Sequence, residues 1–250
     1  MSIGYNGLGN NGRLGNQMFQ YAALRGIAAH RKFDFVFPPP HDTVDNYGIH
    51  DCFNLINVTK NNIAFHSSNS YVQEGQFHFN EEIFEKCPDN VNLYGFYQTM
   101  KYFEEIEDQI REDFSFKKEI LNPCLKMMDS FEKTPIMLHV RRGDPNLADK
   151  RGFKWAYVNL QDQHPVQTIE YYERALAEFD DDVPVIVFSD SIEWCKEQEF
   201  FASDRFNLSE STDKHEDGAL VYCLYVMVEL LLIVLFLGGE HSYKRIALEN

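Results

Sequence analysis

Two apolar segments separated by an amphipathic one constrain the fold of this chain most. Residues 136–140 and 183–188 are short, apolar and rich in β-favouring side chains, which is typical of buried strands. Between them, residues 169–179 place aromatic and aliphatic side chains on one face of a predicted helix. A strand, a helix and a strand in this order form a βαβ unit. The second half of the chain is therefore predicted to contain a parallel sheet.

Polar and charged side chains follow both predicted strands, at the ends where ligands bind in open α/β sheets. Arg141 and Arg142 follow the first strand, and Ser189 and Asp190 follow the second. A guanidinium group suits phosphate oxygens, because it offers a rigid fork of donors and stays charged at any working pH. The sequence therefore predicts an anion site here. A solvated turn whose arginines pair with surface acids would give the same pattern.

Two further residues of this segment could take part in chemistry. Asp144 could accept a proton as a general base, or it could orient one of the arginines. His139 lies within the predicted strand, where a hydrogen-bonded core histidine is commoner than a catalytic one.

The acidic composition excludes one class of function. The chain has 23 Lys and Arg residues against 39 Asp and Glu, a net charge of −16, so it lacks the basic footprint of a general nucleic-acid-binding protein. Its five cysteines are scattered and odd in number, which favours buried free thiols in a reducing compartment. The N-terminus has no pattern of a secretory signal, and a cytoplasmic location is expected.

The N-terminal half begins with a glycine-rich and asparagine-rich stretch, residues 1–15, before a predicted helix over residues 16–30 that Asn16 would cap. A glycine-rich loop that opens a helix can bind an anion through its backbone N–H groups. However, no apolar strand precedes the glycines at 7, 9 and 12, so they make a weak dinucleotide motif. Strands are also predicted over residues 33–37 and 93–97, and helices over 102–114 and 117–133.

Several motifs, taken together and in order, resemble the α-1,2-fucosyltransferases of glycosyltransferase family 11. Residues 14–22 resemble the opening motif of that family. Residues 139–144 are similar to the H-x-R-R-x-D signature that it shares with α-1,6-fucosyltransferases. The resemblance continues through residues 95–98, 101–103, 110–114, 164–166, 170–172 and 188–196, and covers roughly residues 8–217.

The resemblance implies an α/β, GT-B-like fold with two Rossmann-type domains that contain parallel sheets, the second of them incomplete. It divides the chain into an acceptor-side domain (residues 1–125), a donor domain (126–220) and an anomalous apolar tail (221–250). It also implies transfer of fucose from GDP-fucose, with inversion, to a hydroxyl of a galactoside acceptor. Neither a metal nor another cofactor is expected.

The resemblance also implies roles for individual residues. Arg142, together with Arg141, would hold the donor diphosphate and stabilise the charge that develops on it, and Asp144 is the candidate base. The acidic run at residues 180–182 is predicted to be a surface turn rather than a metal site. The predicted donor-binding residues are His139, Arg141, Arg142, Ser189, Asp190, Asn16 and Gln17.

The two ends of the chain depart from the family pattern. The family begins with an apolar strand, but polar residues 2–13 stand in its place, so the first strand is expected to be missing or weakened. Near the other end, residues 220–239 form an apolar run with one charge, Glu229, long enough to span a bilayer. If this run is real, the chain could associate with a membrane.

A shifted reading frame explains the tail better than a membrane helix does. When the last base of each codon is read with the first two bases of the next, residues 237–241 can encode the Trp-Trp-Gly-Ala motif that the family has there. The tail from about Val221 therefore looks out of frame, which resequencing codons 217–250 would test. Two alternatives stay open: an inactive transferase that retains only nucleotide or glycan binding, and a membrane-anchored Rossmann-like protein.

Overall fold

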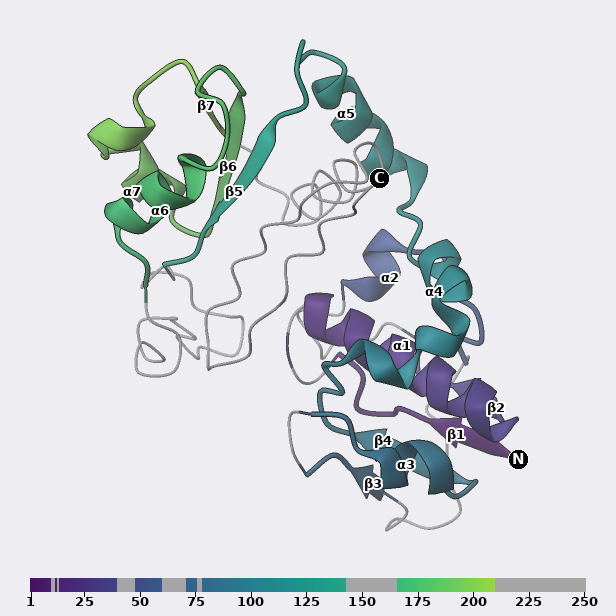
Figure 1. The fold of residues 1–250 in the computed structure, drawn as a ribbon. Helices are drawn as coiled ribbons and strands as arrows, with labels where there is room; N and C mark the ends of the chain where they lie inside the picture. The colour runs from purple at the N-terminus through teal and green to yellow at the C-terminus, as the bar shows by residue number, and fades with distance from the viewer. Residues whose placement is uncertain are drawn as a thin grey trace. The chain divides into compact units, whose positions relative to one another are not determined.

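The computed structural model describes residues 1–9, 12, 14–39, 48–59, 71–75, 78–142 and 166–209. The chain divides into two compact units, unit 1 (Met1–Lys117) and unit 2 (Lys118–Asn250) (Figure 1). The domain boundary predicted from the sequence, after residue 125, falls inside α5 (Lys118–Met128), which belongs to unit 2.

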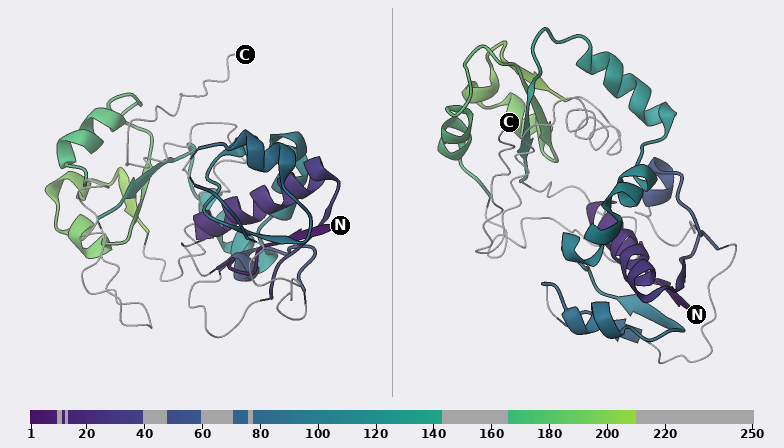
Figure 2. Two further views of the ribbon diagram at one scale, coloured as in Figure 1. Left: turned by 90° about the horizontal axis from the view of Figure 1, so that it is seen from below. Right: turned by 45° about the vertical axis from the view of Figure 1, so that its right-hand side comes forward.

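Unit 1 is built around a four-stranded parallel sheet with the strand order β2-β1-β4-β3. Helix α1 packs against β1 and β2 and also contacts α3, η1 and η2 (Figure 2). The strands are β1 (Ser2–Gly4), β2 (Asp34–Val36), β3 (Tyr71–Gln73) and β4 (Val91–Tyr94). The helices are α1 (Leu14–Arg31), α2 (Ile49–Cys52), α3 (Glu81–Lys86), η1 (Met100–Tyr102), η2 (Glu104–Ile106) and α4 (Glu107–Asp113).

The first strand, predicted to be missing or weakened, is present and has three residues. Strand β1 is short, but it lies inside the sheet, where Ile3 is in register with Phe35 of β2 and Val91 of β4. Ile3 is fully buried, and so is nearly all of Tyr5, directly after the strand. A three-residue strand needs only one apolar side chain to reach the core. Its signal is therefore lost among the glycines and asparagines around it.

Helix α1 is close to its predicted bounds, but Asn16 lies inside it and is not its cap. The face that packs inward is made of small residues, including Ala22, Ala23 and Ala28, which are almost completely buried. At Gly26 the backbone of η1 approaches so closely that a Cβ atom would lie 2.0 Å from the carbonyl oxygen of Tyr102. Small side chains thus allow η1 to pack directly on α1.

Unit 2 contains the predicted βαβ unit. The described strands form a parallel sheet with the order β5-β6-β7, and α6 connects β5 to β6. The elements are β5 (Ile136–Val140), α6 (Ile169–Leu176), β6 (Val185–Ser189), α7 (Ile192–Lys196), η4 (Glu199–Phe201) and β7 (Phe206–Leu208). One core covers a face of this sheet and joins Leu138, Val140, Val185 and Val187 to Tyr172, Leu176, Cys195 and Phe201 of the helices.

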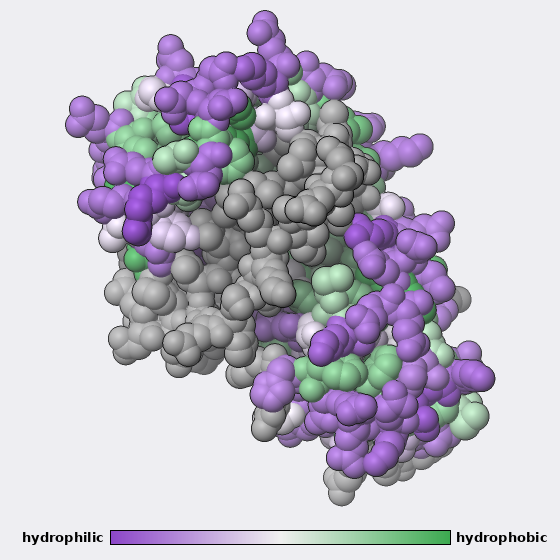
Figure 3. Space-filling model, in the orientation of Figure 1, coloured by the Kyte–Doolittle hydropathy of each residue, from purple (hydrophilic) through white to green (hydrophobic). Residues whose placement is uncertain are grey.

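Surface features of unit 2 follow the sequence predictions where the structure describes them. Residues 180–182 form a turn before β6, in which Asp181 pairs with Arg205 and Asp182 pairs with Lys133. On the face drawn in Figure 3, hydrophilic residues predominate over the described surface.

The described cysteines of both units, Cys52, Cys87, Cys124 and Cys195, are buried free thiols, as predicted.

Three predictions concern residues outside the described segments. They are the role of Asp144, the apolar tail at residues 221–250, and the incomplete second sheet, which depends on residues after 209. None of the helices in the described segments combines the length and the apolar composition of a membrane span.

Candidate functional site

The carboxyl edge of the unit 2 sheet brings together the residues that follow β5 and β6. Val140 is in register with Ser189, so the two chain segments leave the sheet side by side. The Ser189 hydroxyl donates a hydrogen bond to the Val140 carbonyl oxygen (2.8 Å) and accepts one from the Ser191 N–H (2.9 Å). Ser189 therefore fastens the two segments to each other and lies within the framework of the site.

Asp190 fixes both arginines. Its Oδ1 accepts a hydrogen bond from the backbone N–H of Arg142 (2.9 Å), and its Oδ2 lies 3.4 Å from Nε of Arg141. The Asp190 side chain is only 14% exposed, so solvent screens these contacts weakly. Two guanidinium groups and one carboxylate leave a net charge of +1 on these three side chains. The described part of this edge is thus cationic, although the chain as a whole is acidic.

The guanidinium group of Arg142 stacks on Trp194 of α7. Its Cζ atom lies 3.7 Å from the centroid of the Trp194 ring, within the range of a cation–π contact. The sequence analysis included Trp194 in a family-like motif but gave it no role. Trp194 could have been identified from the sequence as an aromatic residue shortly after the carboxyl end of the strand at residues 185–189.

His139 is not the core histidine that the sequence suggested. Along β5, Leu138 and Val140 point into the core, so the alternation of a strand places His139 on the other face, where its side chain is exposed. Enough protein surrounds the ring to desolvate it, and this desolvation, followed by the charge of Arg141, lowers the pKa of His139. His139 is therefore neutral near pH 7.

Other ionisable groups near Arg142 also stay neutral. Burial raises the pKa of Tyr172 to about 12, against the opposing charge of Arg142. Burial also raises the pKa of the Cys195 thiol, against its hydrogen bond to Ser189 and the charge of Arg142. Near neutral pH, the charge of the described site comes from its arginines and Asp190. This arrangement is electrostatically suited to an anion.

Asn16 and Gln17 lie in unit 1, at the start of α1. Gln17 is fully buried: its Nε2 donates to the Gly12 carbonyl oxygen (3.4 Å), and its Oε1 accepts from the Ile49 N–H (3.1 Å). Asn16 accepts a hydrogen bond from the Gln98 side chain. Both amides hold segments of unit 1 together, and their contact with a donor stays a prediction.

A larger polar network surrounds residues 95–98 in unit 1. The Tyr5 hydroxyl accepts a hydrogen bond from the Gly95 N–H (3.0 Å), and Gln20 donates one to the Gly95 carbonyl oxygen (3.0 Å). Oε2 of Glu74 accepts from the N–H groups of Phe96 (3.0 Å) and Tyr97 (2.6 Å). These bonds support a turn that is unusual in its backbone, because φ is +150° at Gly95 and +53° at Tyr97.

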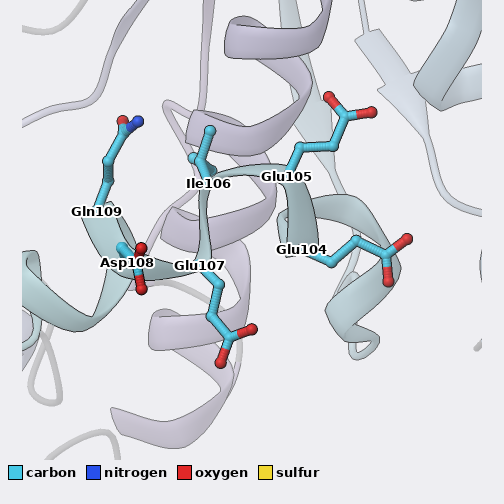
Figure 4. A pocket seen from close by; sticks show the side chains of 6 residues that line it. All are labelled: Glu104, Glu105, Ile106, Glu107, Asp108 and Gln109. Carbon is cyan, nitrogen blue, oxygen red and sulfur yellow. The ribbon is translucent and has the colours of Figure 1, made fainter.

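A polar hollow on unit 1 offers the opposite electrostatics to the arginine edge. It is lined by Glu104, Glu105, Ile106, Glu107, Asp108 and Gln109 (Figure 4). Its carboxylates would repel a diphosphate. Among the described residues, no group of three or more His, Cys, Asp or Glu side chains is placed to hold a metal ion.

Comparison with known proteins decides the family. The model of glycosyl transferase family 11 matches residues 2–227. The chain belongs to glycosyltransferase family 11. Because that match covers most of the chain, this member of the family is a glycosyltransferase.

Individual relatives are distant. An α-1,2-colitosyltransferase of Escherichia coli is 26% identical over 243 residues, covering 82% of this chain and 77% of the relative. The human galactoside α-(1,2)-fucosyltransferase 1 is 26% identical over 200 residues, covering 75% of this chain and 51% of the human protein. The chain thus spans about half the length of this second relative.

The fold resembles that of a solved fucosyltransferase. The crystal structure of NodZ from Bradyrhizobium matches with a TM-score of 0.50 and 10% sequence identity, over 90% of this chain and 85% of NodZ. Together with the parallel sheets of both units, this likeness gives the family member a GT-B-like fold, as the sequence predicted.

Proposed function

We propose that this family 11 glycosyltransferase moves fucose from GDP-fucose to a hydroxyl group of a galactoside, with inversion at the anomeric carbon. The observation that carries the proposal is the cationic edge of the unit 2 sheet. Arg141 and Arg142 leave the carboxyl end of β5 there, and Asp190 holds them. The donor diphosphate is the part of such a substrate that needs fixed positive charge.

The reaction is a single in-line displacement. The acceptor hydroxyl oxygen forms a bond to the anomeric carbon, while the bond from that carbon to the diphosphate oxygen breaks and GDP leaves with the electron pair. Negative charge grows on the diphosphate in the transition state, and guanidinium groups already in place stabilise it. In this proposal the arginines perform that task without a metal.

A general base must take the proton of the acceptor hydroxyl. Asp144, two residues after Arg142, is the proposed base. His139 is the second candidate among the predicted site residues, because its lowered pKa leaves the ring neutral and able to accept a proton near pH 7.

The names of the relatives support the α-1,2 linkage more strongly than they support fucose as the transferred sugar. Both the bacterial and the human relatives carry an α-1,2 designation, but one transfers colitose and the other fucose. A purified sample should therefore be supplied with GDP-fucose and a galactoside acceptor, with a colitosyl donor in a parallel assay. Turnover of the colitosyl donor alone would replace fucose in this proposal. GDP binding without any turnover would favour the inactive transferase.

The Arg142→Ala variant tests the site. It removes charge-assisted hydrogen bonds of about 1.5–3 kcal/mol, so the Kd for GDP in isothermal titration calorimetry should rise about 10- to 150-fold. Lys133→Ala is the matched control. It removes one positive charge from the same unit, but Lys133 pairs with Asp182 at the amino end of the sheet. Equal affinities in Arg142→Ala and the wild type would contradict the assignment.

A further inference from the structure

The two neighbouring arginines are held in different ways. The guanidinium group of Arg141 lies beside the carboxylate of Asp190, which neutralises part of its charge. The guanidinium group of Arg142 lies against the indole of Trp194 instead, and among the described residues it has no carboxylate partner. The backbone N–H of Arg142, rather than its guanidinium group, makes the described contact with Asp190.

An aromatic face holds a cation without consuming its hydrogen-bond donors. A carboxylate would bind the N–H groups of Arg142 and cancel its charge. The ring attracts the guanidinium charge, whose Cζ atom lies 3.7 Å from the ring centroid, without accepting its hydrogen bonds. The N–H groups, which point outward in the guanidinium plane, can therefore serve another ligand. Within the described segments, Arg142 is thus fixed in position without a carboxylate that would cancel its charge.

Trp194 lies near Arg142 because helix α7 follows closely after β6 in the sequence. Ser189 and Asp190 form hydrogen bonds to the segment around the end of β5, and helix α7 begins two residues after Asp190. Trp194 is the third residue of this helix. The side of Trp194 near the core packs with Phe201, whose ring meets the indole at 71° with centroids 6.4 Å apart. The indole is therefore itself held rigidly between the core and the arginine.

We propose that Trp194 is a positioning residue that orients Arg142 toward the donor diphosphate and keeps its donors unpaired. This inference rests on the proposed function and deepens it by dividing the work of the arginine pair. Arg142 binds the diphosphate, and Arg141 shapes the edge through Asp190. Trp194 itself touches neither the sugar nor the phosphates.

Three substitutions at position 194 separate orientation from packing. Trp194→Phe keeps an aromatic face, and GDP affinity should stay within about threefold of the wild type. Trp194→Leu keeps an apolar side chain but loses the face, and the Kd for GDP should rise about 3- to 30-fold. Trp194→Glu would hold Arg142 as an ion pair and occupy its donors, so its Kd should rise more than that of Trp194→Leu.

The experiment measures binding of GDP and of inorganic pyrophosphate by calorimetry, together with kcat and KM for the donor. Because Arg142 meets charge that grows in the transition state, Trp194→Leu should lower kcat as well as raise KM. A purely structural role for Trp194 would instead lower the unfolding temperature and give Phe, Leu and Glu variants the same affinity per folded molecule.

The outcomes distinguish this inference from the proposed function. If the wild type binds GDP or pyrophosphate and Trp194→Leu binds equally well, the positioning role is wrong and the diphosphate site stands. If the wild type binds neither ligand, both proposals fall. If GDP binding weakens progressively from Trp194→Phe to Trp194→Leu to Trp194→Glu, the result supports both the diphosphate site and the positioning role of Trp194.

Discussion

Polar side chains have different roles at the carboxyl edges of the two parallel sheets. In unit 1, uncharged groups such as Tyr5, Gln17 and Gln20 bond to the backbone of neighbouring loops. In unit 2, the described part of the same edge carries two guanidinium groups and one carboxylate, and an aromatic ring holds one of the guanidinium groups. A polar residue at this edge is therefore not enough to identify a ligand site. Charge that the protein leaves uncompensated is the better sign.

Backbone geometry separates the two units as well. Among the described residues, the non-glycine residues with positive φ are Lys32, Asn57, Asn90 and Tyr97, and all of them lie in unit 1. At Tyr97, the Glu74 carboxylate accepts N–H bonds from the strained turn. The polar groups of unit 1 offset this strain, and removing them should cost stability. The charged groups of unit 2 should instead control binding.

The largest effect is expected at Asp190, where stability and binding meet. Asp190→Ala leaves the Arg142 N–H without its acceptor, and the free energy of unfolding should fall by about 1–3 kcal/mol with weaker GDP binding. Asp190→Asn keeps an oxygen acceptor there, so denaturant unfolding and calorimetry should place it nearer the wild type. Asp182→Ala, an exposed control in the same unit, should change neither. Equal losses in Asn and Ala variants would mean that the ion pair with Arg141 matters more than the backbone bond.

Gln17 tests the unit 1 side of the comparison. Gln17→Ala leaves the buried Ile49 N–H without its acceptor, so the free energy of unfolding should fall by about 1–3 kcal/mol while the Kd for GDP stays unchanged. Gln109→Ala removes an exposed amide from the same unit and should stay within about 0.5 kcal/mol of the wild type. Weaker GDP binding without loss of stability would place Gln17 in the donor site, as the family resemblance suggested.

The sequence predicted unit 2 better than unit 1 for a physical reason. Strands β5 and β6 are apolar runs, and once their parallel pairing is expected, topology alone brings Arg141, Arg142, Ser189 and Asp190 to one edge. By contrast, β1 rests on a single buried side chain, Ile3, which no periodic pattern reveals.

Other features depended on backbone geometry and distant contacts. The helix predicted over residues 102–114 is divided into η1, η2 and α4, because the backbone leaves helical geometry at Phe103, where φ is −141°, and again at Ile106, where φ is −126°. The predicted strand over residues 93–97 starts earlier and ends at Tyr94, before the turn at Gly95. The stacking of Arg142 on Trp194 joins side chains far apart in sequence, and only tertiary structure reveals it.

The smallest expected effect is a difference in pH dependence between one histidine of each unit. Around His30, desolvation lowers the pKa, but hydrogen bonds to Glu85 and Glu105 together raise it above 6.5. His30 should therefore stabilise the fold below pH 6.5 and lose that contribution as the pH rises through its raised pKa. The pKa of His139 is lowered, so its cost to stability should appear as the pH falls below 6.5.

Urea unfolding between pH 5 and pH 8 of the wild type, His30→Gln and His139→Gln measures both contributions. His30→Gln should remove a stabilisation of under about 1 kcal/mol that is present only at the acid end. His139→Gln should instead reduce the loss of stability at the acid end. The pKa of His50 is also lowered by burial, but His50 is present in both variants and cancels when they are compared. If His139→Gln instead lowers stability at pH 5, as His30→Gln should, then neither desolvation nor the charge of Arg141 disfavours protonation of His139.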